Sequence, residues 1–185
     1  MNAIEALTTR KSVAMLAEPG PDKAALETMI EAAVRAPDHC HLRPWRFLVI
    51  EGEARARLGD VFAEAERLRA PDTPDAMIEK VRGKPTRAPV IIAVIAKVDE
   101  HPKVPGVEQI LSAGAAAQNI MLTAHALGFG GIWRTGKPCF DPHVKAALGA
   151  REQDLIVGFL YLGTPVRAPA TAKDDIHDYM EHWAG

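Results

Sequence analysis

The sequence has little cysteine, little excess charge and no long hydrophobic run. Its 2 cysteines, Cys40 and Cys139, are too few for the disulfide framework of a small secreted protein. With 22 basic and 24 acidic side chains the net charge is −2, so the total charge favours neither nucleic acid nor an anionic membrane as a partner. The best apolar run, residues 88–96, has about half of the roughly 18 residues that a membrane-spanning helix needs. The amino-terminal residues also lack a signal-peptide pattern, so we expect a cytoplasmic protein with no nucleic-acid or membrane partner.

What the chain does contain is enough apolar material for one core. It has 185 residues, of which 48% are hydrophobic. A domain of this length buries about 70% of the surface that its unfolded chain exposes, and it needs no disulfide to do so. We therefore expect residues 1–185 to form a single domain.

Hydrophobic periodicity predicts a loose alternation of helices and strands. The predicted helices cover residues 4–9, 22–36, 53–69, a segment that ends near residue 83, 107–127 and 141–148. The predicted strands cover residues 47–50, 88–98 and 155–162. The continuous apolar run 88–98 is typical of a strand covered on both faces, and helix 107–127 is expected to be almost fully buried. We expect the excursion 53–87 to be exposed, and its length favours an α+β fold over a regular βαβ array.

Glycine-rich segments suggest nucleotide binding, but their spacing does not match the known fingerprints. Residues 128–136, GFGGIWRTG, place Trp133 where the dinucleotide fingerprint needs its third glycine, and they follow a helix instead of a strand. A P-loop motif is also absent from the sequence. An anionic group could instead be held by Arg10, Lys11 and Ser12, which gather a guanidinium, an ammonium and a hydroxyl at a helix end. The alternative for these residues is a solvated helix terminus.

The segment 37–45, PDHCHLRPW, gathers possible metal ligands between two prolines. Four of them are adjacent: Asp38, His39, Cys40 and His41. Neighbouring residues of one loop rarely converge on one ion, so we expect no metal site. A thiolate at Cys40 beside a histidine is a second alternative, and a plain polar loop is the third.

Taken in order, four motifs resemble a known family. They are RKS at residues 10–12, RAPDH at 35–39, LGFGGIWRTG at 127–136 and REQDLIVGFLYLGTP at 151–165. In this order and at these separations they resemble the flavin-dependent nitroreductase family, most closely a subgroup of small members. The resemblance covers essentially the whole chain.

The resemblance implies a fold, a cofactor and an activity. It implies a nitroreductase-like α+β fold with a central mixed or antiparallel sheet flanked by helices, in an intertwined homodimer with FMN at the subunit interface. It also implies an FMN-dependent oxidoreductase that takes hydride from NADH or NADPH and reduces nitroaromatic, quinone or similar acceptors by ping-pong chemistry. The flavin N5 then carries the reaction, with no catalytic side chain. Because the small subgroup lacks the extra helices that roof the active site of larger relatives, a flavin-binding or storage protein with little turnover is the alternative.

The same resemblance implies which residues bind the cofactor. Arg10, Lys11 and Ser12 match the grip on the phosphate and ribityl chain of FMN. Arg35 matches a contact supplied from the other subunit, and His39 matches a neighbour of the flavin. The backbone of Trp133, Arg134 and Thr135 matches the strand beside the flavin ring.

A nicotinamide-nucleotide contact is implied at the end of the long helix. Its residues are Thr123, Ala124, His125, Ala126, Leu127 and Gly128. At Asp38, His41 and Arg43 the chain departs from the serine, asparagine and glutamine of many family members, so the resemblance assigns these three no contact.

Overall fold

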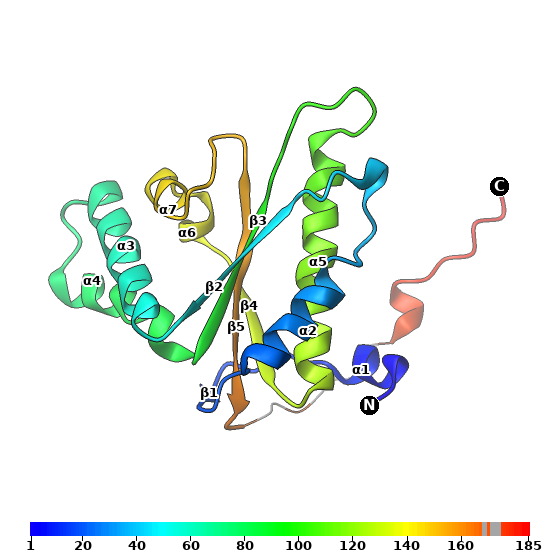
Figure 1. Cartoon of the computed structure of the whole chain (residues 1–185), viewed down its shortest axis with the longest axis horizontal. Helices are drawn as coiled ribbons and strands as arrows, with labels where there is room; N and C mark the ends of the chain where they lie inside the picture. The colour runs from blue at the N-terminus through cyan, green and yellow to red at the C-terminus, as the bar shows by residue number, and fades with distance from the viewer. Residues whose placement is uncertain (168–169, 171–174) are drawn as a thin grey trace.

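One antiparallel sheet organises the fold in the computed structural model, which describes residues 1–167, 170 and 175–185 (Figure 1). Its strands are β1 (Leu16–Ala17), β2 (Trp45–Glu51), β3 (Val90–Ala96), β4 (Gly130–Arg134) and β5 (Leu155–Pro165). Strand β3 pairs with β2 on one edge and with β5 on the other. The far edge of β5 is shared by β4 and the short β1. The predicted α+β class with a mixed or antiparallel sheet is confirmed, and the sheet is antiparallel throughout these pairings.

Helices cover both faces of the sheet. They are α1 (Ala3–Thr9), α2 (Lys23–Ala33), α3 (Glu53–Arg69), α4 (Asp75–Arg82), α5 (Gly106–Ala126), α6 (Lys137–Phe140) and α7 (Pro142–Ala147), with short 3-10 turns at His39–His41, Pro85–Arg87 and Ile176–Asp178. Helices α2 and α5 pack on one face, while α3, α4, α6 and α7 lie on the other (Figure 1). No helix among the described residues is long and apolar enough to cross a membrane.

Strand β3 is the centre of both cores. All of its residues are buried, as predicted for a continuous apolar run. Because side chains alternate along a strand, Ile92 and Val94 join the core beneath α2 and α5. Ile91 and Ala93 join the core on the α3 side. In the neighbouring strands the side chains alternate in the same way between the two faces of the sheet.

The structure of the single chain contradicts two expectations about burial, one for helix 107–127 and one for the excursion 53–87. Helix α5 is buried where it faces the sheet and α2, but Val107 and Leu111 remain 60% and 66% exposed. The excursion 53–87, expected to be exposed, instead covers one face of the sheet. Its Phe62 is buried against Phe159 in an edge-to-face contact with ring centroids 5.2 Å apart. The excursion has many charged residues, but a narrow apolar stripe along α3 is enough to bury one face of that helix.

The close packing of α3 on α4 depends on Gly59. A Cβ atom at this position would collide with the carbonyl oxygen of Arg82, which belongs to the last turn of α4. At Gly83, by contrast, a Cβ atom would lie 3.5 Å from the carbonyl oxygen of Glu79, an ordinary contact, and φ is −73°. Gly59 is therefore needed for close approach of the two helices, whereas Gly83 is not.

Asp154 joins the start of β5 to the end of β3. Its carboxylate is 5% exposed and accepts hydrogen bonds from the Arg151 side chain and from the backbone N–H groups of Arg151 and Val98. Burial alone would raise the pKa of Asp154, but these hydrogen bonds and the charge of Arg151 lower it. Arg151 also donates to Asp99, which is exposed.

We expect Gly59→Ala to lower the free energy of unfolding by about 1–3 kcal/mol, because the added methyl group overpacks the α3–α4 contact. Denaturant unfolding followed by circular dichroism measures the change, with Gly83→Ala as the control that stays near wild type. An unchanged unfolding free energy in Gly59→Ala would contradict the close approach of these helices.

We expect Asp154→Asn to lower the free energy of unfolding at pH 7 by about 1–3 kcal/mol, because it leaves buried donors without a charged acceptor. The native pKa of Asp154 lies below the unfolded value of about 3.9, so its contribution is present above that pH and is lost as the pH falls. The variant should therefore show a flatter decline of stability below about pH 4. Asp99→Asn, at the exposed end of the same cluster, is the control and should change little; equal effects of the two substitutions would rule out this role for Asp154.

Candidate functional site

The loop that carries Arg10, Lys11 and Ser12 lies beside strand β4. Helix α1 ends at Thr9, and the chain then runs along the strand, where the Val13 N–H donates to the Gly131 carbonyl at 2.9 Å. The glycines of β4 make this approach possible. A Cβ atom at Gly130 would lie 2.9 Å from Leu16 and 3.3 Å from Val13. The two motifs RKS and FGGIWRTG are thus neighbours in space.

Strand β4 offers free backbone groups on its outer edge. Its inner edge is paired with β5, and the Gly131 carbonyl points outward to Val13. Because backbone groups of an antiparallel strand alternate between its two edges, those of Trp133 point outward as well. Thr135 follows directly after the strand. The strand can therefore offer hydrogen bonds to a flat ligand lying along this edge.

The end of α5 belongs to the same region. Thr9 Oγ1 and His125 Nε2 share a hydrogen bond at 2.8 Å, which joins the end of α1 to the last turn of α5. The helix closes with the Phe129 N–H donating to the Ala124 carbonyl, and Gly128 takes a φ of 90° in the turn into β4. One chain thus brings together the loop 10–12, the segment 123–128 and β4.

Arg35 and His39 lie elsewhere in the chain. His39 Nδ1 contacts Glu108 Oε2 at 2.8 Å, at the first turn of α5, whereas His125 is in its last turn. At about 1.5 Å of rise per residue, Glu108 and His125 are about 25 Å apart along the helix axis. Arg35 follows α2, whose end is tied to the middle of α5 by the Asn119 side chain, which donates to the Ala32 carbonyl at 2.9 Å. A single chain does not bring His39 to the loop 10–12.

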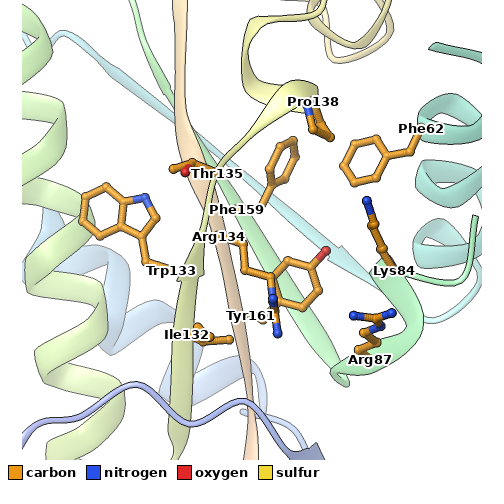
Figure 2. Close-up of a pocket in the computed structure, with 10 residues that line it drawn as sticks. All are labelled: Phe62, Lys84, Arg87, Ile132, Trp133, Arg134, Thr135, Pro138, Phe159 and Tyr161. Carbon is orange, nitrogen blue, oxygen red and sulfur yellow. The ribbon is translucent and has the colours of Figure 1, made fainter. Parts of the chain in front are cut away.

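A cavity of about 300 Å³ opens between β4 and β5 on one side and α3 and the turn after α4 on the other (Figure 2). Three cationic side chains line it: Lys84, Arg87 and Arg134. Three aromatic side chains form much of its wall: Phe62, Phe159 and Tyr161. Sequence reasoning missed Lys84 and Arg87 because they belong to no motif and are remote in sequence from β4.

Arg134 has an unmet hydrogen-bonding group in this cavity. Its guanidinium lies over the Tyr161 ring, 5.4 Å from the centroid, and its Nε is buried with no partner in the described part of the chain. Buried polar groups normally have partners, so this Nε fits a ligand that accepts a hydrogen bond. Burial raises the pKa of Tyr161 to about 12 against the opposing effect of Arg134 and Arg87, so its hydroxyl stays protonated at neutral pH.

The Trp133 side chain points away from this cavity. Figure 2 shows the indole on the α5 side of β4, where it packs into the core with α2 and α5. Its Nε1 donates to the Val157 carbonyl at 3.2 Å, and Gly158 leaves the space that the ring needs. A role of Trp133 toward a ligand at the edge of β4 is therefore a role of its backbone.

The segment 37–45 is a tight turn held by Asp38. The Asp38 carboxylate accepts from the N–H groups of Leu42 and Arg43, and Cys40, His41 and Arg43 all have positive φ. This explains the aspartate in structural terms, as a cap of the turn. Within residues 1–167, 170 and 175–185, no three His, Cys, Asp or Glu side chains come together in a way that could hold a metal ion. The other cysteine, Cys139, is buried, and burial raises its pKa to about 11.

Comparisons with known proteins identify the family of this chain. Residues 7–164 match the model of the nitroreductase family. A provisionally named NAD(P)H nitroreductase, YdjA of Escherichia coli K12, is 48% identical over 172 residues, 93% of each chain. A provisionally named NAD(P)H nitroreductase of Haemophilus influenzae is 40% identical over 165 residues, 89% of each chain.

Solved structures share the fold. A nitroreductase-like family protein of Bacillus cereus superposes with a TM-score of 0.83 at 26% identity, over 100% of this chain and 97% of that one. A Desulfovibrio desulfuricans protein, provisionally described as a nitroreductase and solved in complex with FMN, gives a TM-score of 0.72 at 26% identity, over 100% and 99%. The resemblance found in the sequence motifs is confirmed, and this chain belongs to the nitroreductase family.

Proposed function

We propose that the protein is a cytoplasmic FMN-dependent oxidoreductase that takes hydride from NADH or NADPH and reduces nitroaromatic, quinone or similar acceptors in a ping-pong cycle. Residues 1–185 would act as one FMN-binding domain. The names of its relatives and the FMN complex of the Desulfovibrio protein support this proposal. The observation that carries it is the hydrogen bond of Val13 to Gly131, which places the loop 10–12 next to the edge of β4.

The residues along β4 fit the parts of FMN in order. Arg10, Lys11 and Ser12 offer two cations and a hydroxyl for the phosphate beside Gly131. From Gly131 to Thr135 the chain advances about 13 Å at roughly 3.3 Å per residue, which leaves room for the ribityl chain before the ring. The backbone groups of Trp133 and Thr135 would then meet the ring edge.

When bound, FMN would supply the hydride and electron transfer. The chain would bind and orient it. The guanidinium of Arg134, with its unpartnered Nε, would favour negative charge near the ring edge, and the protonated Tyr161 hydroxyl would offer a neutral donor nearby. No side chain needs to act as an acid or base for this role.

The last turn of α5 and the turn that follows it are our candidate for the nicotinamide nucleotide. This segment lies beside the loop 10–12 through the Thr9–His125 hydrogen bond, and its last residues are exposed. The proposed contacts are Thr123, Ala124, His125, Ala126, Leu127 and Gly128.

We propose that the working form is an intertwined homodimer with FMN between the subunits. Val107 and Leu111 on α5 and Ile4 and Leu7 on α1 are exposed apolar side chains that a second copy would cover. If two α5 helices pack antiparallel, the Glu108 end of one lies beside the His125 end of the other. Arg35 and His39 of the partner subunit would then reach the loop 10–12, across the 25 Å that one chain cannot span.

The carboxy-terminal residues support the intertwined arrangement. Residues 175–185 extend away from the body of the chain (Figure 1), and Tyr179 and Trp183 are 78% and 92% exposed. Large aromatic side chains that remain in water in one chain gain free energy when a second chain buries them.

We expect purified protein to be yellow, to release FMN on denaturation and to lose its flavin absorption when NADH or NADPH is added without oxygen. Arg10→Ala should weaken FMN binding about 10- to 150-fold, because it removes a charge-assisted hydrogen bond. Titration of the apoprotein by flavin fluorescence measures the affinity, with exposed Arg57→Ala on α3 as the control. Colourless protein that takes up no FMN would overturn the proposal, and bound FMN that neither nucleotide reduces would indicate a flavin-storage protein.

We expect Arg35→Ala also to weaken FMN binding, and we expect a mixture with Arg10→Ala to recover it in part. A mixed dimer has one site that lacks both arginines and one site that keeps both, so half of its sites should bind FMN as in wild type. Coexpression with two affinity tags isolates the mixed dimer for the titration. No recovery in the mixed dimer would show that the two arginines do not share a site across subunits.

A further inference from the structure

The cationic cavity beside β4 continues past the proposed flavin edge. A second cavity of about 150 Å³ shares Phe62, Lys84, Thr135 and Pro138 with it and leads toward α6. Both lie on the α3 side of the sheet, next to the part of β4 where the ring would end. A molecule in this space would be close to the flavin edge without displacing the loop 10–12.

The charges of this cavity are unbalanced. No acidic side chain among the described residues lines the 300 Å³ cavity, and Lys84, Arg87 and Arg134 form no ion pair in that part of the chain. Glu66 lines the second cavity, where it is paired with Arg69 and Lys137. Other cations of the same layer are paired. Arg82 contacts Asp60 and Glu79, and Arg69 contacts Glu66 and Asp141. Three unpaired cations around one cavity favour an anionic ligand.

The walls of the cavity favour an aromatic ligand. Phe62 stands edge to face against Phe159, with an interplanar angle of 77°. Tyr161 presents its ring to Arg134, and in Figure 2 its hydroxyl points toward the side on which Lys84 and Phe62 lie. Aromatic side chains of this kind pack well against a planar ring.

We propose that this cavity binds the carboxylate of an aromatic acceptor, with Lys84 as the residue that selects for the charge. Arg134 is already stacked on Tyr161 and Arg87 is exposed, whereas Lys84 is half-buried with its ammonium at the cavity. The choice of acceptor rests on the proposed function, but binding of an aromatic carboxylate does not depend on it. The protein therefore prefers anionic aromatic acceptors to neutral ones of the same shape.

The kinetic test compares 4-nitrobenzoate with methyl 4-nitrobenzoate, which have similar shapes but differ in charge. Because the nitro group of the ester is intrinsically easier to reduce, the ratio of the two kcat/KM values, acid to ester, is compared between variants. Lys84→Met should lower the ratio of the two kcat/KM values about 10- to 150-fold, chiefly through KM of the acid, because one charge-assisted hydrogen bond is lost. Lys80→Met, which removes the same charge from an exposed position on α4, is the matched control and should leave the ratio unchanged.

The binding test uses benzoate, which cannot be reduced. Isothermal titration of the oxidised protein with benzoate should give a dissociation constant that rises by a similar factor in Lys84→Met and not in Lys80→Met, while benzyl alcohol should not bind. The FMN dissociation constant of each variant is measured in parallel. Protein that binds benzoate but no FMN would overturn the proposed function and leave this inference standing.

Three results would overturn the inference. The same ratio of kcat/KM for the acid to kcat/KM for the ester in wild type and in Lys84→Met would show that Lys84 does not select for charge. An unchanged benzoate dissociation constant in Lys84→Met would separate Lys84 from the anion. Weaker FMN binding in Lys84→Met with an unchanged ratio of acid to ester would mean that the cavity holds part of the flavin.

Discussion

Strand β5 is the constraint on which the candidate site depends. It is 11 residues long and holds β3 along one edge, while β4 and β1 follow each other along the other. Because β1 pairs at the end of β5, the chain before it must run beside β4, and Val13 bonds to Gly131 there. The cationic loop and the edge of β4 are therefore brought together by strand pairing and by this hydrogen bond.

The length of α5 separates two groups of residues that the family resemblance assigns to one cofactor site. Its ends carry contacts to His39 and to Thr9, about 25 Å from each other. A helix of 21 residues cannot bend enough to close this distance, so residues at both ends can serve one ligand only if a second chain reverses the direction. The uncovered apolar residues Val107 and Leu111 lie on the helix that would make that contact. The proposed dimer would account both for this exposed apolar face and for the separation of the proposed site residues.

Much of the fold could be predicted from local pattern, and the errors have identifiable causes. The uninterrupted apolar run of β3 and the long periodic stretch of α5 needed no tertiary information. Burial was less predictable, because an apolar stripe as narrow as that around Phe62 is hidden by flanking charges. Of the site, the loop 10–12 and β4 follow from motifs. Lys84 and Arg87 could not be found in this way, because only the packing of α3 and α4 on the sheet brings them to β4.

The near-neutral total charge conceals how the charges are distributed on the α3 side. Exposed ion pairs such as that of Arg82 with Glu79 contribute little to the free energy of unfolding. Stability alone therefore does not explain why the cations of α3 and α4 are paired with carboxylates. These ion pairs neutralise the surroundings of the cavity. The three cations that line it have no ion-pair partner among the described residues. Holding Lys84, Arg87 and Arg134 near one another costs free energy through repulsion, and burial of the unpartnered Arg134 Nε adds to that cost. Carboxylates are plentiful in the neighbouring helices α3 and α4, yet none of them faces this cavity among the described residues. The proposed anionic ligand would offset this repulsion when it binds.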